Sequence, residues 1–567
     1  MTVDDSAAGP GAPSGGLRAL TGDAAARVAA LDGAQFDAVV IGAGILGAGV
    51  ARELARRGRR TLVVDRRDAG WGTTNRSTRL VHGGLRYLEH FDFPLVHEGL
   101  RERGWLLRAT PRLVTPLGLL LPYYRESWFH RTQLRMGLTL YDLLAPRKSL
   151  PRHRSVSRAQ AVEMEPALSP DGLNSAGFYW DGQVELPERL IVEILRAAEG
   201  YGATVATRCR AVGLRRSGGR VTGISLRADA GMPLVGLEDA GGPGSDRVVE
   251  VSAPLVINAS GPWADGVLAD LGVERAPILR LTQGVHLQYP FGTRYAVAFE
   301  HPTDRRLCFA IPWQGGTMVG TTDTDVDGGP EAAKATADEV RYVDDGARFL
   351  FPEAATKRPT WVEVGVRSLM RREGSAGAVS RKHLLVDHAP DGAGGLTTVA
   401  GGKLTAWRSI AADVVDTATG TRDGHALDAV SLTGEPLPPA RQRGVKDMTS
   451  GRLPGDAEAR LDLVYGPYRG EVDAIRASDP WWAAPLVDGS HAVRAEVAHG
   501  TEHEWAVTLA DLVMRRMALG FEPDLARRAG REAGAVLEAA CGWPRERVEA
   551  DLADLERELV EHEVPAI

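Results

Sequence analysis

The pattern of apolar and polar positions between residues 36 and 65 predicts a strand, a tight turn, a helix and a second strand. Ala38–Ile41 is a short apolar run that ends at a glycine turn, Gly42–Gly47. Apolar residues then recur three and four positions apart over Leu46–Arg57, as on one face of a helix. Thr61–Val64 is a second apolar run and follows directly. This order is typical of the first unit of a doubly wound α/β domain.

Three glycines and one acid in this unit point to dinucleotide binding. Gly42 allows the tight turn, Gly44 lets a pyrophosphate approach the backbone, and Gly47 lets the helix pack on the strand. The diphosphate is expected at the N-terminus of the helix, where unpaired N–H groups and the helix dipole favour anions. Asp65 lies 18 residues after Gly47, about where a ribose-binding acid is expected. The alternative is a plain strand-to-helix turn, which the complete unit disfavours.

The middle of the chain continues to alternate between segments with the apolar spacing of a helix and segments with that of a strand. An amphipathic helix is predicted over Pro187–Glu199, and residues 229–246 are predicted to form an exposed insertion because they are rich in Gly, Asp and Pro. Strands are predicted at Ala203–Ala206, Val221–Leu226, Val248–Val251 and Leu255–Ala259. The last of these ends in Ser260-Gly261, and ligands of doubly wound sheets meet the carboxyl ends of strands. Gly261 is therefore expected to face the cofactor, with a plain Gly-Pro turn as the alternative.

Residues 276–325 differ from the rest, because short alternating runs follow one another without helices between them. This pattern predicts strands of a separate sheet. A further strand is predicted at Leu396–Ala400, and Gly401–Thr405 is predicted to open a helix behind it. Such a second glycine-rich helix start offers another contact to the cofactor. The cofactor domain is then built from separated pieces of chain, with the other sheet inserted between them.

The last third of the chain is predicted to be helical. Residues 418–450 are rich in Thr, Gly, Pro and Arg and are interpreted as a linker. Apolar residues recur at helical spacing from about Asp456 to the end of the chain. The predicted helices are His491–Gly500, Glu504–Leu519, Pro523–Cys541 and Pro544–His562. Packing and stability are the expected role of this domain.

Composition narrows the class of protein. The chain has 567 residues, which is too long for one core, and its net charge of −7 disfavours a nucleic-acid-binding protein. The three cysteines, Cys209, Cys308 and Cys541, have neither metal nor redox spacing, which fits a reducing compartment. Residues 1–34 lack an apolar signal core and are expected to be a disordered tail, with one short helix near residues 24–31. No metal is predicted.

Residues 73–88 form an unusually polar segment for this position in a doubly wound domain. It combines hydroxyl residues, arginines, a histidine and the pair Gly83-Gly84 with the anchors Leu80, Leu85 and Leu88. A domain that binds NAD usually moves directly to its next strand. A polar, glycine-containing segment suits a larger cofactor, whose flavin end must be held by backbone. The alternative is a polar surface loop, which the three leucines disfavour.

Several sequence blocks resemble the FAD-dependent glycerol-3-phosphate dehydrogenases. The first blocks are IGAGILGAG, GTTNRSTRLVHGGLRYLEHFDF and LVHEGLRERGWLLRATPRLVTPL. Later blocks agree: INASGPWAD at 257–265, RLTQGVHLQYP at 280–290, FAIPWQGGTMVGTTDTD at 309–325, VGVRSLMR at 364–371, SRKHLLVD at 380–387 and VAGGKLTAWRSIA at 399–411. The similarity spans residues 36–420 and continues more weakly into the C-terminal helices.

The resemblance implies an α/β fold with an FAD-binding Rossmann-like domain of the glutathione-reductase/D-amino-acid-oxidase type. An antiparallel-sheet substrate domain is expected as an insertion, and a helical cap domain at the C-terminus. The expected oxidoreductase region is 35–430, and the helical domain is 431–567. Within the oxidoreductase region, the FAD-binding pieces are about 35–110, 165–275 and 380–430, and the substrate sheet is about 276–379.

The resemblance also implies the chemistry of the site. Arg86 and Arg367 stand in the two blocks that carry substrate-contacting arginines, and a forked guanidinium suits a phosphorylated substrate. Lys403 and Tyr87 match positions near the same pocket. His286, in a QGxH block, is the candidate general base for the hydroxyl proton. The alternatives are a core histidine and surface salt bridges, and the blocks favour the functional roles for the arginines.

The predicted cofactor is FAD. The glycine turn, the polar segment and the later blocks together give its predicted binding residues, which are Gly42, Gly44, Ile45, Leu46, Gly47, Asp65, Arg66, Thr73, Thr74, Ser77, Thr78, Leu80, His82, Gly83, Gly84, Val212, Ser260, Gly261, Gly402, Lys403, Leu404 and Thr405.

The function implied by the resemblance is oxidation of sn-glycerol 3-phosphate to dihydroxyacetone phosphate, with electrons passed to a quinone. One alternative passes the electrons to oxygen, and another oxidises an amine or a hydroxy acid. A protein that keeps FAD as a structural ligand belongs to a different class, and the converging cations disfavour it. The electron acceptor and the oligomeric state, a homodimer included, are left open by the sequence.

A quinone acceptor requires contact with a bilayer, and residues 113–158 are the candidate segment. It contains apolar and aromatic residues, Leu117–Leu121 among them, beside eight cations and only Glu126 and Asp142 as acids. Apolar groups flanked by cations suit an interfacial segment. The alternative is core packing with solvated basic residues. No apolar run reaches the length of a membrane span. The predicted location is the cytoplasm or the cytoplasmic face of a membrane.

Overall fold

The protein is described by a computed structural model. It describes residues 24–124, 128–145, 150–229, 247–371, 383–423, 429–437 and 455–566, together with the backbone alone at 86, 89, 90 and 128–131. Except for Asp229, the predicted insertion at 229–246 falls outside the described residues, as do most of the predicted linker and residues 1–23. The short helix expected near residues 24–31 is present. Helix α1 (Ala24–Ala29) packs Val28 into a core beneath the first sheet.

A six-stranded sheet carries the predicted dinucleotide unit. Its strand order is β18-β19-β11-β1-β2-β7, and all neighbours pair in parallel except β18 with β19. The strands lie within residues 35–110, 165–275 and 380–430, and the second of these ranges contributes both β7 and β11. The strands are β1 (Ala38–Ile41), β2 (Thr61–Val64), β7 (Thr204–Ala206), β11 (Val256–Asn258), β18 (Leu384–Asp387) and β19 (Leu396–Ala400).

Both faces of this sheet are buried, which explains the continuous apolar runs in its strands. Val40 and Val63 join the core beneath helices α2 (Ile45–Arg56), α6 (Pro187–Gly200) and α9 (Trp407–Thr419). Val39 and Leu62 point the other way, into a second core. That core is covered by α7 (Ala264–Asp270) and a small antiparallel sheet of β8 (Cys209–Ser217), β9 (Arg220–Ala228) and β10 (Val248–Ser252).

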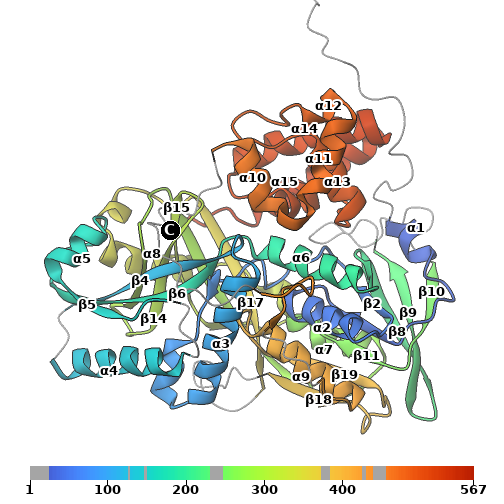
Figure 1. Ribbon diagram of the computed structural model, residues 1–567, viewed down its shortest axis with the longest axis horizontal. Coiled ribbons are helices and arrows are strands. Elements are labelled where there is room, and N and C mark those ends of the chain that lie inside the picture. Colours follow the sequence, from blue (N-terminus) through green and yellow to red (C-terminus); the bar gives the residue numbers. More distant parts are fainter. Residues whose placement is uncertain are drawn as a thin grey trace, which may run out of the picture.

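A larger sheet of ten strands lies beside the first (Figure 1). Its order is β16-β12-β15-β14-β13-β4-β6-β3, with β17 on β12 and β5 on β6. The strands are β3 (Leu80–Val81), β4 (Val114–Tyr124), β5 (Arg154–Ser157), β6 (Leu173–Val184), β12 (Leu279–Tyr289), β13 (Ala296–Glu300), β14 (Leu307–Trp313), β15 (Gly316–Gly320), β16 (Thr324–Asp325) and β17 (Trp361–Met370).

The composition of this sheet corrects the predicted domain pieces. We expected the substrate sheet within 276–379, but β3, β4, β5 and β6 come from residues 80–184. Alternation of apolar and polar residues predicts that a segment forms a strand. Only long-range contacts decide which other strand it pairs with. Helix α8 (Ala337–Leu350) covers one face of the sheet, and its start carries a capping box between Thr336 and Glu339.

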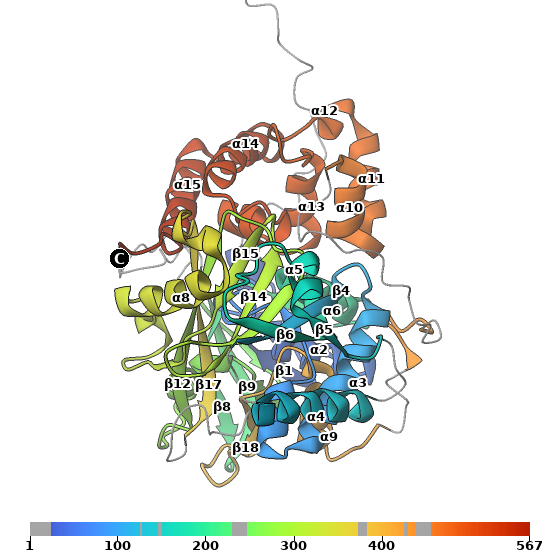
Figure 2. The same ribbon diagram turned by 90° about the vertical axis from the view of Figure 1, so that its left-hand side faces the viewer.

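The other face of β4 packs on α3 (Phe93–Ala109), on α4 (Trp128–Leu144) and on the short helix η1 (Leu85–His90). Figure 2 shows α3 and α4 side by side at the lower edge of the molecule. Leu119 and Leu121 point into this core, and Leu120 points into the core under α8. The apolar run of the predicted membrane segment is therefore a buried strand, so Leu117–Leu121 is not a bilayer contact. Within the described residues, no helix is long and apolar enough to cross a bilayer.

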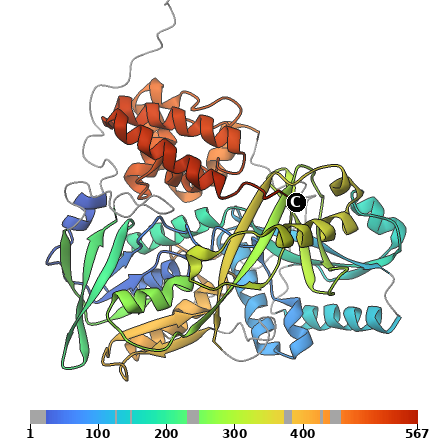
Figure 3. The same cartoon turned by 180° about the vertical axis from the view of Figure 1, so that it is seen from behind.

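The C-terminal domain is helical, as predicted, and sits over α6 and the Asp65 side of the first sheet (Figures 1 and 3). Its predicted helix Pro523–Cys541 is present with those bounds, and Asp456 caps the first helix by accepting from the Ala459 N–H. The helices are α10 (Ala457–Tyr465), α11 (Arg469–Ser478), α12 (Pro480–Ala483), α13 (Ala495–His503), η8 (Asp511–Arg516), α14 (Pro523–Cys541) and α15 (Arg545–Val560). The remaining short elements are α5 (Arg158–Met164), η2 (Gly261–Trp263), η3 (Pro330–Ala332), η4 (Pro352–Ala355) and η7 (Gly466–Tyr468).

Candidate active site

The glycine turn lies where the carboxyl ends of β1 and β11 meet. Gly42 has a φ of +105°, and a Cβ there would lie 2.7 Å from the carbonyl oxygen of Ala259. A Cβ on Gly47 would lie 1.8 Å from the carbonyl oxygen of Gly42, so this glycine lets α2 pack against the turn. Gly44 is different, because its φ is an ordinary −76° and the nearest atom to its Cβ position is 3.6 Å away. The space into which a side chain at Gly44 would point is therefore open for a ligand.

Asp65 follows β2 and is held in place by backbone donors. Its carboxylate accepts from the N–H groups of Ala43 at 2.7 Å and of Arg67 at 2.8 Å. Burial raises the pKa of this carboxyl, and the two N–H groups act in the opposite direction. The acid predicted to bind ribose is therefore fixed beside the glycine turn, 22 residues away in sequence.

These residues line a cavity of about 1340 Å³. Its lining runs from Asp65 and the start of β8, past the glycine turn and residues 401–405, to His286 and Arg367 on the large sheet. Pockets for single small molecules are typically about 300–1,000 Å³. The size and the course of the lining suit a dinucleotide together with a small substrate.

The polar segment at residues 73–88 connects the two sheets. The hydroxyl of Thr74 accepts from the N–H of Ile45 at 3.2 Å, at the start of α2. The hydroxyl of Thr73 donates to the carbonyl of Val366 on β17, at 2.5 Å. This segment is therefore a wall of the cavity with fixed hydroxyls, and the alternative of a free surface loop is wrong.

His286 lies on β12 at the inner end of the cavity and is 3% exposed. Its Nε2 is 3.0 Å from the hydroxyl of Thr78. Its Nδ1 has no hydrogen-bond partner among the described residues. Burial lowers the pKa of this imidazole to about 3, and the nearby cations Arg367 and Arg79 lower it further in the same direction. The ring is therefore neutral at pH 7 and can accept a proton.

Arg367 and Lys403 are two cations of the same cavity. Arg367 lies on β17 opposite Thr282 of β12, and its guanidinium donates to the carbonyl of Thr322 and to the carboxylate of Asp323, both at 3.1 Å. The Nζ of Lys403 is 3.7 Å from the centre of the Tyr87 ring. Arg86 lies in η1, one residue before Tyr87, and its side chain is outside the described part of the chain.

The segment Gly401–Thr405 lines the cavity but does not open a helix as predicted, because α9 begins at Trp407. Gly401 and Gly402 have φ of +74° and +100°, so the chain turns here before the helix. The hydroxyl of Thr405 accepts from the N–H of His82 at 3.2 Å. The loop is thereby joined to the polar segment across the cavity wall.

Comparison with known proteins identifies the family. The family model described as "FAD dependent oxidoreductase" matches residues 37–408, and that of the "C-terminal domain of alpha-glycerophosphate oxidase" matches residues 430–548. A glycerol-3-phosphate dehydrogenase of Synechocystis is 34% identical over 91% of this chain and 95% of its own length. The glycerol-3-phosphate dehydrogenase 2 of Mycobacterium tuberculosis is 32% identical over 92% of this chain and 87% of its own length. The chain belongs to the FAD-dependent glycerol-3-phosphate dehydrogenase family.

Solved structures agree on the fold. The glycerol-3-phosphate dehydrogenase of Bacillus halodurans, solved in complex with FAD, has a TM-score of 0.73 and covers 96% of this chain and 99% of its own. Its sequence identity is 23%. The glycine oxidase of Geobacillus kaustophilus has a TM-score of 0.51 and covers 70% of this chain. The predicted FAD-binding fold and helical C-terminal domain are thereby confirmed.

The residues of this family member fit FAD. The open side of Gly44 at the N-terminus of α2 provides a path for a pyrophosphate, and Asp65 stands where a ribose hydroxyl is expected. Ser260 and Gly261, at the end of β11, also line the cavity, with Gly261 at a φ of +59°. Most of the predicted cofactor residues line this cavity: Gly42, Gly44, Ile45, Leu46, Asp65, Arg66, Thr73, Thr74, Ser77, Thr78, Leu80, His82, Ser260, Gly261, Gly402, Lys403, Leu404 and Thr405.

Four predicted cofactor residues do not line the cavity: Gly47, which packs against the glycine turn, and Gly83, Gly84 and Val212. The N–H of Gly83 donates to the hydroxyl of Tyr141 at 2.7 Å, and a Cβ on Gly83 would lie 2.6 Å from Leu100. Gly84 has a φ of +79° and packs on the ring of Tyr87. Gly83 therefore lets the loop pack on α3 and α4, and Gly84 lets it turn over Tyr87 of η1. Val212 lies one residue beyond the part of β8 that lines the cavity, Cys209–Ala211.

Sequence reasoning missed Arg79, which is fully buried in the cavity wall. Its guanidinium lies 3.4 Å from the carboxylate of Glu188, 3.2 Å from that of Glu363 and 4.1 Å from the centre of the Trp313 ring. Arg79 stands in the same polar segment as Ser77 and Thr78. Nothing in a run of polar residues distinguishes a buried arginine from a solvated one, because its partners lie more than 100 residues away.

Trp71, Trp263 and Glu331 were missed for the same reason. The two tryptophan rings lie 5.8 Å apart at the Asp65 end of the cavity. The carboxylate of Glu331, from the large-sheet domain, pairs with Arg66 and accepts from the indole N–H of Trp263 at 2.6 Å. This contact places the two domains together beside the predicted ribose site.

Proposed function

We propose that the protein uses the cavity to oxidise sn-glycerol 3-phosphate to dihydroxyacetone phosphate with FAD and passes the electrons to a quinone. One observation carries the proposal: Arg367, Lys403 and a neutral His286 converge on the same cavity as the glycine turn. The named relatives, glycerol-3-phosphate dehydrogenases at 32–34% identity, support the choice of substrate.

The cations are assigned to the phosphate and the neighbouring hydroxyls. A forked guanidinium binds phosphate oxygens through two parallel N–H donors. Arg367 is suited to this task because Asp323 and two backbone carbonyls already hold its Nη1 in place. A side chain fixed in advance loses less entropy when a substrate binds. Arg86, Lys403 and Tyr87 are assigned to the same substrate.

His286 is assigned the role of general base. Its pKa of about 3 keeps the ring neutral, so a lone pair is free to accept the proton of the substrate hydroxyl. Once the ring is protonated, Thr78 supplies an acceptor hydroxyl at 3.0 Å for the proton on Nε2. FAD, when bound, accepts the hydride from the carbon that carries this hydroxyl.

A protein that keeps FAD only as a structural ligand is the competing class. Such a site needs the glycine turn and Asp65, but it has no use for cations and an unpartnered buried imidazole nitrogen at the far end of the cavity. A buried polar atom without a partner costs free energy, about 1–3 kcal/mol. Such an atom at a cavity surface is therefore better explained by a ligand that it contacts.

Anaerobic reduction of the flavin separates these classes. Purified protein should be yellow. Addition of sn-glycerol 3-phosphate should bleach the flavin absorption bands within the time of one enzymatic turnover, whereas glycerol at the same concentration should not. The matched control is the enantiomer sn-glycerol 1-phosphate, which presents the same charge with the wrong handedness. A flavin that dithionite reduces but sn-glycerol 3-phosphate leaves oxidised would rule out the proposed function.

The quinone and membrane parts of the proposal rest on a different surface, which we name the α4 face. It consists of the exposed side chains Phe91, Phe93, Arg135, Met136 and Leu143. The four apolar members are 76%, 37%, 67% and 74% exposed, respectively. Such exposed apolar groups beside a cation suit the surface of a bilayer that contains anionic lipid.

The α4 face adjoins the wall of the cavity. Helix η1 carries Tyr87 in the cavity lining and ends next to the exposed Phe91. The imidazole of His97 lies 3.0 Å from the carbonyl of Leu144, which joins α3 to the end of α4. A quinone that approaches from a bilayer at this face would therefore come within one short helix of the cofactor site. This arrangement supports a location at the membrane surface.

Oxygen is the competing acceptor. The test is to reduce the enzyme anaerobically with substrate and then mix it either with a short-chain ubiquinone or menaquinone analogue or with air-saturated buffer. Reoxidation is expected to be much faster with the quinone, with little peroxide formed in air. Equal rates, with one peroxide per substrate, would identify an oxidase.

A further inference from the structure

Two segments of chain form the Asp65 end of the cavity, and they are bonded to each other. The first, residues 65–70, follows β2, and the second, residues 206–211, joins β7 to β8. The N–H of Cys209 donates to the carbonyl of Asp65 at 2.7 Å, and the N–H of Arg208 donates to the carbonyl of Arg67 at 3.1 Å. Whatever displaces one segment therefore displaces the other.

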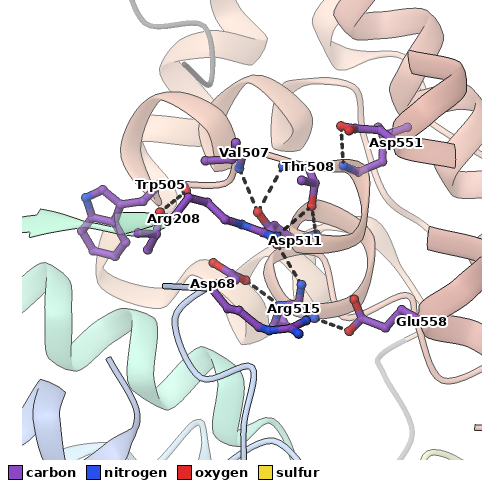
Figure 4. A network of polar contacts seen from close by, with 12 residues as sticks. Asp68, Arg208, Trp505, Val507, Thr508, Asp511, Arg515, Asp551 and Glu558 are labelled. Carbon is purple, nitrogen blue, oxygen red and sulfur yellow. Dashed lines mark hydrogen bonds and ion pairs between the residues drawn. The ribbon is translucent and has the colours of Figure 1, made fainter. Parts of the chain in front are cut away.

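Each segment also carries a charged residue that is bound by the C-terminal domain: Asp68, which is fully buried, and Arg208, whose side chain is 12% exposed (Figure 4). Asp68 accepts from Arg515 at 2.5 Å and from both terminal nitrogens of Arg516, at 2.8 and 2.6 Å. All three side chains have no solvent exposure. Asp68 itself belongs to the cavity lining, three residues after the predicted ribose acid.

The second segment is bound by the same helix of the C-terminal domain, η8. Arg208 donates to the carboxylate of Asp511 at 2.6 Å, and Asp511 also accepts from Arg515 at 2.8 Å. The hydroxyl of Thr207 donates to the carbonyl of Trp505 at 3.1 Å. Figure 4 shows that Arg515 stands between Asp68, Asp511 and Glu558, so one side chain connects both segments.

These contacts fix the position of the cavity wall from outside the cavity. Among the described residues, the lining ends at Thr405, so the C-terminal domain contributes no side chain of its own. Breaking one partner of a buried ion pair leaves an uncompensated charge, which costs far more than a surface pair does. Docking of η8 therefore adds restraints on the loops beside Asp65 to those that their own backbone bonds provide.

We propose that the C-terminal domain is a clamp that sets the affinity for FAD, with Asp68 and Arg208 as the positioning residues that transmit its docking to the cofactor site. The clamp acts on the half of the cavity that contains Asp65 and not on the substrate end. The proposal rests on the FAD site of the family and is independent of the substrate and of the electron acceptor.

The competing explanation is that these ion pairs only join two domains. The same interface offers a matched control for it. Arg189 of α6 forms a two-point ion pair with Glu504, at 2.7 Å for each contact, and both side chains are fully buried. Arg189 does not belong to the cavity lining. Arg189 also donates to the carbonyl of Arg516, and the carbonyl of Glu504 accepts from the Nε of Arg516, so this pair touches the clamp only through backbone groups. Changing the carboxylate of Glu504 leaves those backbone groups in place and should therefore weaken the interface more than it moves the loops beside Asp65.

The experiment compares D68N with E504Q in the full-length protein. FAD affinity is measured by titrating apoprotein and following the quenching of flavin fluorescence, and the thermal stability of each apoprotein is measured in parallel. D68N is expected to weaken FAD binding on the order of tenfold or more, the size of effect that loss of an outer partner has at metal sites, whereas E504Q should change it by less than about threefold. Equal losses of affinity in the two variants would overturn the proposal.

The wild-type protein provides a second test, which decides the question if either variant fails to fold. Linkage is reciprocal, so a domain that strengthens FAD binding must itself be stabilised by FAD. Amide hydrogen exchange over residues 507–517 should slow when FAD is added, although these residues do not line the cavity. Helix α14 in the same domain is the internal control and should change less. Identical exchange at 507–517 with and without FAD would overturn the clamp.

Discussion

The Nε2 atom of His286 and the hydroxyl of Thr78 lie 3.0 Å apart at the end of the cavity that also holds Arg367. His286 comes from the large sheet and Thr78 from the polar segment that follows the dinucleotide unit. Their contact joins the substrate side to the cofactor side of the site. The contact also orients the imidazole, which burial and the cations Arg367 and Arg79 keep neutral.

Replacing His286 with Gln should therefore lower kcat roughly 100- to 10,000-fold, the usual contribution of a general base, with FAD content unchanged. T78V is the matched variant, because it removes one neutral hydrogen bond worth about 0.5–1.5 kcal/mol and should cost roughly tenfold at most. Stopped-flow reduction of the flavin measures both. A His286 variant that reduces its flavin at nearly the wild-type rate would assign the base to another group.

Two glycines of the same turn should respond differently to valine. A Cβ on Gly44 has 3.6 Å of clearance, so G44V should fold but purify colourless, since its side chain occupies the pyrophosphate path. A Cβ on Gly47 would lie 1.8 Å from the carbonyl of Gly42, so G47V should fail to fold stably. Flavin absorbance and circular dichroism separate the outcomes. A yellow G44V protein would show that the phosphates pass elsewhere.

Arg367 should matter for a phosphorylated substrate in particular. Loss of one charge-assisted contact costs about 1.5–3 kcal/mol, so R367A should lower kcat/KM for sn-glycerol 3-phosphate roughly ten- to a hundred-fold. The loss for glycerol should be much smaller. R280A is the control, because Arg280 lines the same cavity but pairs with Asp325 at 2.6 Å near its edge. Similar losses of R367A on both substrates would remove Arg367 from the phosphate site.

His562 gives a pH-dependent prediction for stability. Its Nδ1 lies 2.9 Å from the carbonyl of Val362 and its ring stacks on Trp361, and burial lowers its pKa to about 3, with further lowering by Arg76, Arg79 and Arg515. An imidazole in the unfolded chain titrates near 6.5. Below that pH the unfolded chain therefore binds a proton that the native protein does not, and this residue's contribution to stability is lost as the pH falls.

The measurement is the difference in the free energy of unfolding between wild type and H562N, at pH 7.5 and at pH 5.5. The wild-type advantage should shrink at the lower pH by up to about 1.4 kcal/mol per pH unit below 6.5. The difference is needed because several carboxyls have pKa values raised by burial and act in the opposite direction, among them Glu185, Glu188, Glu199 and Asp551. A difference that does not change with pH would contradict the assignment.

The α4 face should bind anionic vesicles. Wild-type protein is expected to co-sediment with them at low salt and less so at high salt, and M136E/L143E should abolish the binding because both side chains are strongly exposed. V248E is the control, since Val248 is also exposed but lies on β10, far from α4 in Figures 1 and 3. Wild-type protein that stays in the supernatant, or a double variant that binds as well as wild type, would exclude this face.

Local patterns in the sequence determined much of the fold. The unit from Ala38 to Asp65, helix Pro187–Gly200 and helix Pro523–Cys541 were predictable because their apolar spacing and turn glycines are encoded within a few residues of one another. The sequence blocks also led to FAD and to most of the residues that line the cavity, since residues that contact one ligand cluster in short motifs with special turn chemistry.

Only the tertiary structure decided which strands share a sheet and which charges are buried. Strand β6 was assigned to the cofactor domain, yet it pairs with β4 in the large sheet, and the apolar run of β4 was taken for a membrane contact. The buried partners of Arg79 and Asp68 come from segments more than 100 residues away. The spacing of apolar residues and the composition of a segment specify which secondary structure that segment prefers locally. Burial is a property of the assembled chain, because it depends on which distant segments cover a side chain.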